Sequence, residues 1–342
     1  MDPITQGAVG AAFAQTSADK DKVKAFAIFG ALAGMAPDLD VFIQSSTDPF
    51  LFLEFHRHFT HSLVFIPIGA LLVTLALYRL WRHPLSFRQA YLAAFIGYAT
   101  HGLLDACTSY GTQLLWPFSN VRIAWNNVSV VDPLFTIPLI ALVVIAARRE
   151  SRAIMLTSLV WVFGYLLFGV YQHDRAVATA HAMAIERGHT PNRLTVKPGF
   201  ANLMLWKSIY EHQNNYFVDG IRVAFDEQVC VGTRIEKYSQ RKHLPKLDLA
   251  SQQALDIERF RWFSQDYLAV QQHDNAIIDI RYSAVPNDIA PMWGIDIDVN
   301  AQPDAHAKYL TMRRINNEQT QQLMDLLAGK TCAPLRSSND QA

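Results

Sequence analysis

Nearly unbroken apolar runs fill much of the first half of this chain, and they constrain its fold more than any other feature. The four long runs cover residues 62–81, 89–107, 128–147 and 154–172. Each approaches the roughly 20 residues that an α-helix needs to cross the hydrocarbon core of a bilayer. Two shorter apolar stretches, at 4–16 and 23–36, precede them. The pattern predicts an α-helical membrane domain with about four long and two short helices.

The composition changes at His173, after which charged residues are frequent and no apolar run exceeds the length of a strand. Periodic segments at 174–187, 252–272 and 317–328 predict helices. Alternating segments predict strands at 193–197, 203–210, 216–225, 228–236, 277–283 and 293–299. We expect a membrane-embedded helical domain at 1–172, an extracytoplasmic α+β domain with a mostly antiparallel sheet at 173–332, and a flexible tail at 333–342.

Basic residues between the apolar runs predict the orientation of the membrane domain. They form three groups: Lys20, Lys22 and Lys24; Arg79, Arg82, His83 and Arg88; and Arg148, Arg149 and Arg152. The positive-inside rule makes these three loops cytoplasmic. The helices then cross the membrane six times if the short pair is counted, and the chain leaves on the outer side near Gln172. The acidic start at Asp2 lacks the features of a cleavable signal, so the first membrane segment is expected to remain attached.

Three features narrow the class of function. The formal net charge is zero, so nothing suggests a nucleic-acid partner. The chain has no G-x-S-x-G, Walker A or dinucleotide-binding pattern. Its three cysteines include no C-x-x-C pair, which argues against a thiolate zinc site. Cys230 and Cys332 both lie in the second half and could form a disulfide if that half is exported, with two free thiols as the alternative.

Aspartate and histidine residues recur at the ends of apolar segments that this topology places on the outer side. Such groups are costly beside hydrocarbon unless they are paired or bound to a metal. Six are predicted to bind one or two divalent ions at a common depth: Asp38, Asp40, His56, His61, His101 and Asp105. His101 and Asp105 are four residues apart, so a helix presents both on one face.

The donor types indicate the chemistry of such a site. Carboxylates and imidazoles without thiolates suit zinc, with manganese or iron(II) as alternatives. A bound ion would lower the pKa of a coordinated water to about 7 and polarise a phosphoryl or carbonyl oxygen. Asp38 or Asp40 could act as general base, and Arg57, between the histidines, could hold a phosphate or carboxylate group.

Several of these residues also have simple structural interpretations. Asp2 and Asp132 each precede a proline and are expected to be helix N-caps. Thr60 is expected to cap a helix that begins at His61 and Ser62. His58 is expected to lie away from His61, and Glu54 has no assigned role. A single His-x-x-x-Asp pair is more often a hydrogen-bonded structural pair than a ligand pair.

Four motifs together resemble one known family, over residues 1–172. They are Asp2-Pro3-Ile4-Thr5, Ala36-Pro37-Asp38-Leu39-Asp40, His56-Arg57-His58-Phe59-Thr60-His61-Ser62 and His101-Gly102-Leu103-Leu104-Asp105. The family is that of inner-membrane, metal-dependent hydrolase-like proteins whose founding bacterial member is described as LexA-binding. The resemblance implies a bacterial inner-membrane location and a metal-dependent hydrolase, and it allows a LexA-type partner. Gln6 stands where a relative could carry a ligand histidine.

We therefore expect a membrane-bound, metal-dependent hydrolase that acts on an ester or phosphoester at the outer membrane interface. Its partners would be the lipid bilayer and a lipid-like or phosphorylated substrate. The alternative is a non-catalytic scaffold or transport module with a structural or transported ion. A closed ligand shell would favour that alternative, because catalytic sites keep one coordination position open.

Overall fold

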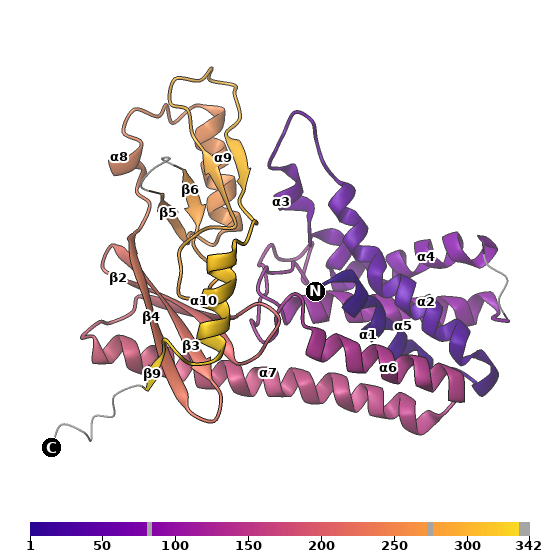
Figure 1. The fold of residues 1–342 in the computed structure, drawn as a ribbon. Helices are drawn as coiled ribbons and strands as arrows, with labels where there is room; N and C mark the ends of the chain where they lie inside the picture. The colour runs from indigo at the N-terminus through magenta and orange to yellow at the C-terminus, as the bar shows by residue number, and fades with distance from the viewer. Residues whose placement is uncertain (81–83, 272–275, 335–342) are drawn as a thin grey trace. The chain divides into compact units, whose positions relative to one another are not determined.

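The computed structural model describes residues 1–80, 84–271 and 276–334, which form two compact units (Figure 1). The first unit consists of Met1–Ile43, Phe55–Tyr171 and Phe200–Asn202. The second consists of Gln44–Glu54, Gln172–Gly199 and the chain from Leu203 onward. Arg82 and His83 of the predicted second basic loop lie outside the described residues, as do residues 335–342 of the predicted tail.

The first unit is helical, as the apolar runs predict. Its main helices are α1 (Pro3–Gln15), α2 (Val23–Met35), α4 (Ile66–Leu80), α5 (Phe87–Ala106), α6 (Pro133–Arg149) and the first part of α7 (Arg152–Glu186). Three helical stretches of the described chain are long and apolar enough to cross a membrane: Lys20–Phe42, Leu63–Leu80 and Arg152–Glu186. The segments predicted separately at 154–172 and 174–187 form one continuous helix, α7, which Figure 1 shows along its whole length.

Glycine allows α1, α2 and α5 to pack side by side (Figure 1). A β-carbon on Gly10 of α1 or on Gly97 of α5 would clash with the backbone carbonyl of Gly30 on α2. A β-carbon on Gly34 would lie 2.7 Å from the backbone oxygen of Gln6. Gly10, Gly30, Gly34 and Gly97 therefore allow these helices to pack closely. This packing matters for function, because two candidate metal ligands follow directly after α2, on the 3₁₀ helix η2 (Ala36–Phe42), and two lie near the C-terminal end of α5.

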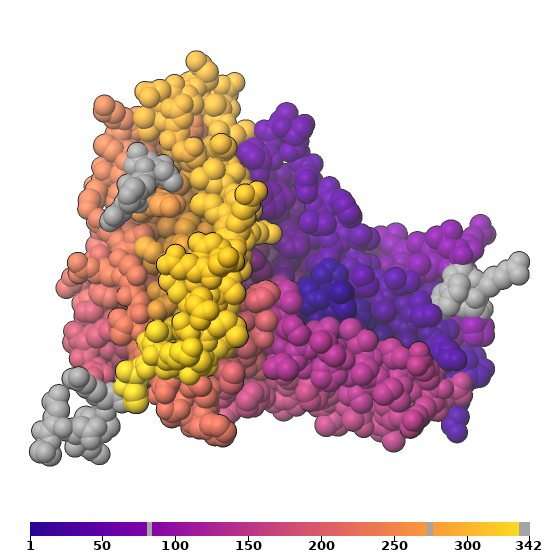
Figure 2. All heavy atoms as spheres, in the orientation of Figure 1, coloured from indigo at the N-terminus to yellow at the C-terminus, as the bar shows by residue number. Residues whose placement is uncertain are grey.

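The second unit contains two antiparallel sheets, which confirms the predicted α+β class. The first has the order β1-β2-β3-β4-β9, and the second has the order β5-β6-β7-β8. The strands are β1 (Arg193–Pro198), β2 (Leu205–His212), β3 (Asn215–Val223), β4 (Glu227–Glu236), β5 (Leu268–Val270), β6 (Ile277–Asp279), β7 (Trp293–Asp296), β8 (Lys308–Thr311) and β9 (Ala333–Pro334). The helices α8 (Gln240–His243), α9 (Gln252–Phe263) and α10 (Asn317–Leu327) complete the unit, and Figure 2 shows α10 on its surface.

The helix predicted at 252–272 is wrong in its second half. Helix α9 ends at Phe263, and the chain turns back to form strand β5. Gln265 and Asp266 adopt left-handed backbone conformations, with φ of 52° and 58°, which no α-helix can contain. The guanidinium of Arg193 donates to the carbonyl oxygens of both residues, at 2.8 and 2.7 Å. A distant arginine therefore stabilises a turn that local periodicity does not reveal.

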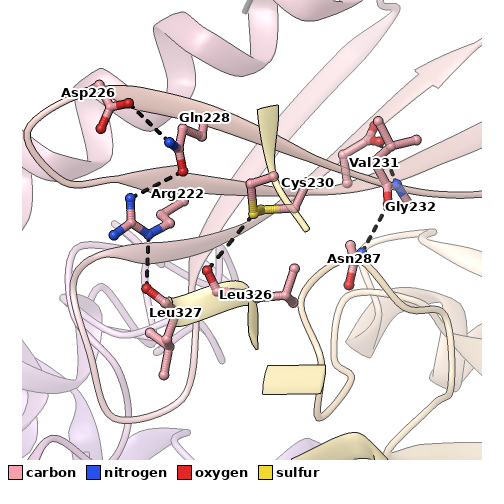
Figure 3. Close-up of a disulfide and its surroundings, with 11 residues drawn as sticks. Arg222, Asp226, Gln228, Cys230, Val231, Gly232, Asn287, Leu326 and Leu327 are labelled. Atoms are coloured by element: carbon pink, nitrogen blue, oxygen red, sulfur yellow. Dashed lines mark hydrogen bonds between the residues drawn. A yellow bond between two sulfur atoms is a disulfide. The ribbon is translucent and has the colours of Figure 1, made fainter. Parts of the chain in front are cut away.

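A disulfide between Cys230 and Cys332 links β4 to the end of the described chain (Figure 3). Of the two alternatives for these cysteines, a disulfide or two free thiols, the structure has the disulfide. Around it, Arg222 donates to the carbonyl oxygen of Leu327 at 2.9 Å and to the side chain of Gln228 at 3.2 Å. The end of α10 is thus joined to the sheet by a hydrogen bond, and the segment that follows it is joined by the disulfide. Cys107, in the first unit, is free and buried.

Charged side chains are buried inside the second unit. Asp279 and Arg281 form an ion pair at 2.7 Å, and neither side chain is more than 1% exposed. Lys207 is also buried, and its ammonium donates to Ser283 Oγ and to the carbonyl oxygens of Pro286 and Asp288. Burial lowers the pKa of Lys207 to about 7.

This lysine gives the stability of the second unit a defined pH dependence. An unfolded lysine has a pKa of about 10.4, so above pH 7 the unfolded chain binds more protons than the folded one. The contribution of Lys207 to the unfolding free energy therefore rises with pH, by up to about 1.4 kcal/mol per pH unit. We expect the difference between the melting temperatures of wild type and Lys207→Met to shift in favour of wild type as the pH rises from about 7 to 9. The exposed Lys246 provides the control, because Lys246→Met should show a constant offset; an equal trend in both variants would contradict the assignment.

Candidate metal centre

The first pair of candidate ligands lies where α2 tightens into a 3₁₀ helix, η2 (Ala36–Phe42). The apolar stretch at 23–36 ends at Ala36, but Ala36 keeps helical angles and the chain continues as a 3₁₀ helix. Pro37 is compatible with this because the first turn of a helix needs no hydrogen bond from its amide. Asp40 is buried and Asp38 is partly exposed, so the two carboxylates have different access to solvent.

The histidine-rich segment is positioned by Asp40. The backbone turns at Arg57, whose φ of 63° lies in the left-handed region, and then forms the 3₁₀ helix η3 (Phe59–His61). Asp40 Oδ2 accepts hydrogen bonds from the amide of Arg57 and from the hydroxyl of Thr60, both at 2.9 Å. The predicted N-cap role of Thr60 is therefore wrong: Thr60 lies inside η3 and bonds Asp40.

His101 and Asp105 come from α5, one turn apart and both fully buried. Gly102 lies between them, and a β-carbon there would clash with the carbonyl oxygen of His61. The absence of a side chain at Gly102 lets η3 approach α5 closely. As a result, ligands separated by 40 residues along the chain come within hydrogen-bonding distance.

Four buried or partly buried groups form the first cluster, which we call the inner group: Asp38, His61, His101 and Asp105. One donor atom from each lies within 4.8 Å of all the others. The Nε2 atoms of His61 and His101 are 2.9 Å apart. Each of them lies 3.5 Å from Asp38 Oδ1, and they lie 3.3 and 3.8 Å from Asp105 Oδ2.

These separations fit a tetrahedral ion. Zinc bound at about 2.0–2.1 Å by nitrogen and oxygen ligands has neighbouring ligand atoms about 3.3 Å apart. The five distances of the inner group, from 2.9 to 3.8 Å, fall around this value. Asp105 Oδ2 supports the same interpretation, because it is buried and has no hydrogen bond of good geometry within the described chain.

The ring orientations also favour a cation. His101 Nδ1 donates to the carbonyl oxygen of Gly34 at 2.5 Å, and His61 Nδ1 faces Thr60 Oγ1 and Asp40 Oδ2 at 3.0 and 3.2 Å. With Nδ1 protonated in both rings, the two Nε2 lone pairs point toward one another and toward carboxylates. Burial lowers the pKa of His61, but hydrogen bonds to three carboxylates outweigh it and raise that pKa to about 10. Because metal ligands must be deprotonated, a divalent ion bound here would displace a proton from His61.

A second cluster, the outer group, consists of Asp38, Asp40 and His56. His56 Nδ1 lies 2.8 Å from Asp40 Oδ1, and the His56 side chain is 37% exposed. Asp38 belongs to both groups and therefore connects the two candidate sites. The six residues predicted from the sequence thus form a mostly buried set of four donors and a more accessible set of three, with Asp38 common to both.

Asp105 is surrounded by further polar groups that the ligand pattern did not reveal. Arg57 is buried, with Nε 3.0 Å from Asp105 Oδ2 and Nη1 donating to Thr108 Oγ1 at 3.0 Å. Gln6 Nε2 donates to Asp105 Oδ1 at 2.9 Å, and the amino group of Met1 contacts the same oxygen. The sequence signal for Gln6 was its place directly after the first motif, where a ligand was expected to be missing.

The remaining polar residues of the motifs lie outside both groups. Asp2 caps α1 by accepting from the amide of Thr5, and Asp132 caps α6, so both cap predictions are confirmed. His58 packs against Trp116, with ring centroids 5.3 Å apart. Glu54 belongs to the second unit and pairs with Arg259.

Apolar side chains surround the accessible end of the site. Leu39 and Phe42, on the same 3₁₀ helix as the two aspartates, are 63% and 77% exposed. Val41 is also exposed. Exposed apolar groups next to exposed carboxylate form an amphiphilic surface, which is typical of the boundary between hydrocarbon and water.

Comparisons with known proteins concern mainly this first half. The model of the YdjM inner membrane protein family matches residues 1–176. The chain is also similar to the uncharacterized protein YfhP of Bacillus subtilis (strain 168), with 28% identity over 154 residues. That similarity covers 44% of this chain and 46% of YfhP, so the chain spans about half the length of that relative. No solved structure matches the chain.

The family match and the three long apolar helices agree on association with the inner membrane. The matched region contains both ligand groups and ends within α7. Because the family model covers more than half of its residues, the chain belongs to the YdjM inner membrane protein family.

Proposed function

We propose that this chain is a multi-pass, membrane-bound, metal-dependent hydrolase that cleaves an ester or phosphoester of an amphiphile. The observation that carries the proposal is the convergence of two imidazole lone pairs and two carboxylates in the inner group, at tetrahedral spacing. This convergence supports metal binding at the cluster; a divalent ion held by the adjoining outer group, zinc or alternatively manganese or iron(II), would supply Lewis acidity and an activated water.

The two groups suggest a division of labour. The inner group offers four donors, three of them buried, which is the number in the closed shell of a structural ion. The outer group offers three donors and includes the exposed imidazole of His56, so a position remains for water or substrate. We therefore assign the reaction to the outer group and assign to the inner group the task of fixing Asp38.

The protein residues would then have distinct roles. Asp40 accepts from the Arg57 amide and the Thr60 hydroxyl and contacts His56, so it orients the histidine segment. Asp38 is the more exposed carboxylate and is the candidate general base. The burial of Arg57 and its contact with Asp105 support a positioning role for this guanidinium, which balances the negative charge of the cluster.

The exposed Leu39, Val41 and Phe42 support a substrate with both a polar head and an apolar chain. The Cys230–Cys332 disulfide supports an extracytoplasmic location of the second unit, because structural disulfides persist in oxidising compartments. Substrate would then reach the site from the outer leaflet.

The test is hydrolysis by the detergent-purified full chain. We expect metal-dependent cleavage of phosphatidic acid or p-nitrophenyl palmitate in mixed micelles, at least about tenfold faster than cleavage of glycerol 3-phosphate or p-nitrophenyl acetate. The short substrates carry the same scissile phosphate or ester group but lack the long acyl chains. EDTA should abolish the activity, and added Zn²⁺ or Mn²⁺ should restore it.

The closed inner group also favours one alternative, a non-catalytic membrane scaffold with a structural ion. In that case the purified chain would contain metal but would cleave none of the four substrates, and EDTA would lower its melting temperature. Faster cleavage of the short substrates would instead contradict the proposal that the substrate is an amphiphile.

A further inference from the structure

The segment Gln44–Glu54 lies between the two sets of ligands in the sequence but belongs to the second unit. Asp40, in η2, comes four residues before it, and His56 comes two residues after it. Both ends of the segment are therefore tethered to ligands of the outer group. Whatever holds this segment in place also restrains the separation of Asp40 from His56.

Arg259 of α9 holds the segment by several polar contacts. Its Nη1 and Nη2 donate to the two carboxylate oxygens of Asp48 at 2.9 and 2.8 Å, a bidentate pair. Its Nε donates to Glu54 Oε1 at 2.5 Å. The hydrogen bond from Arg259 is the main cause of a lowered pKa at Asp48. Bidentate arginine–carboxylate pairs add geometric specificity as well as energy.

Arg259 is itself held in place by a buried aspartate of the same helix. Its Nη1 also donates to Asp256 Oδ1 at 3.3 Å, one turn earlier in α9. Asp256 is fully buried and accepts the amide of Ala307, with His306 Nδ1 2.9 Å from the same carboxylate. The guanidinium is therefore part of a network that is anchored in the interior of the second unit.

Aromatic contacts strengthen the attachment. Phe50 is fully buried, and its ring lies edge-to-face with Tyr309 of β8 at 6.2 Å. Phe52 contacts the same tyrosine at 5.2 Å. The guanidinium of Arg259 lies 5.5 Å from the centre of the Phe50 ring. The segment is therefore held by several contacts, both before and within its short helix α3 (Leu51–Phe55), and not by a single ion pair.

We propose that Arg259 is a positioning residue for the metal centre, through which the second unit sets the spacing of Asp40 and His56. The inference rests on the proposed metal binding by the outer group. The second unit then acts on the metal centre through the chain itself, because loosening Gln44–Glu54 would lower the metal affinity of the outer group.

The test compares Arg259→Gln with Arg261→Gln in the detergent-purified full chain. Arg261 lies on the same helix and pairs with Glu258 and Asp266, so its replacement also breaks ion pairs of α9 but none to Gln44–Glu54. We expect Arg259→Gln to weaken Mn²⁺ binding about tenfold, as loss of residues that orient ligands does elsewhere. Arg261→Gln should bind as wild type, and Arg259→Lys should recover part of the affinity.

Two measurements keep the inference separate from the proposed function. Electron paramagnetic resonance of free Mn²⁺ gives the affinity, and hydrogen–deuterium exchange follows residues 44–61. We expect Arg259→Gln to accelerate exchange both in Gln44–Glu54 and at 56–61. Wild-type Mn²⁺ affinity in Arg259→Gln, equal weakening in Arg261→Gln, or faster exchange confined to 44–54 would each overturn the inference. Failure of wild type to bind Mn²⁺, Zn²⁺ or Fe²⁺ would instead overturn the proposed function.

Discussion

Replacing both His61 and His101 with alanine is expected to remove the ion of the inner group and so to lower the metal content of the purified chain, while the three donors of the outer group remain. The two Nε2 atoms supply half of the four donors in the inner group, and they are its only nitrogen ligands. Their removal leaves Asp38 and Asp105 facing one another without a second pair of ligands. The measurement is elemental analysis of the full chain, purified in detergent without chelators and compared with wild type at equal protein concentration.

The matched control for this double variant is His58→Ala. His58 lies in the same histidine segment but belongs to neither ligand group, and its ring packs against Trp116. It should keep the wild-type metal content. Equal metal in wild type and in the double variant would contradict the inner group as the binding site, and equal loss in His58→Ala would show that the whole segment had unfolded.

Loss of the Cys230–Cys332 disulfide is expected to destabilise the second unit by about 3–5 kcal/mol, which corresponds to a fall in melting temperature of about 10 °C. The crosslink joins residues 102 positions apart, so its loss gives the unfolded chain much additional freedom. The measurement is thermal unfolding of Cys332→Ser. The free thiol of Cys107 offers the control, since Cys107→Ala leaves the crosslink intact.

Thiol labelling tests the same bond in untreated cells. Cys230 and Cys332 should resist alkylation under denaturing conditions until a reductant is added, whereas Cys107 should react at once. Labelling of all three cysteines without reductant would contradict both the disulfide and the extracytoplasmic location that it supports.

Local sequence rules succeeded where the determining interactions lie close together in the chain. The apolar runs predicted the helical first half, and alternation predicted strands such as β2 and β3. The caps at Asp2 and Asp132 followed from the proline after each. By contrast, strand β8 was missed, and the helix at 252–272 was extended too far, because Arg193 stabilises the turn after α9 from a distant strand.

The amino-acid sequence by itself determined which residue types meet at the site. Six aspartates and histidines at the ends of apolar helices cannot remain unpaired next to hydrocarbon, and the helical spacing of His101 and Asp105 directs both to one face. Only the tertiary structure decided how they divide. The inner and outer groups arise because Gly102 lets η3 approach α5 and because Asp40 bonds the turn at Arg57.

The role of Gln44–Glu54 was also decided by tertiary structure alone. Nothing in its local sequence separates this segment from the membrane half, since its partners Arg259 and Tyr309 lie more than 200 residues away in the sequence. Contacts over such distances depend on the complete packing of both sheets and α9, and no periodicity or spacing encodes them locally. The sequence therefore specified the donors, and the fold specified what holds them.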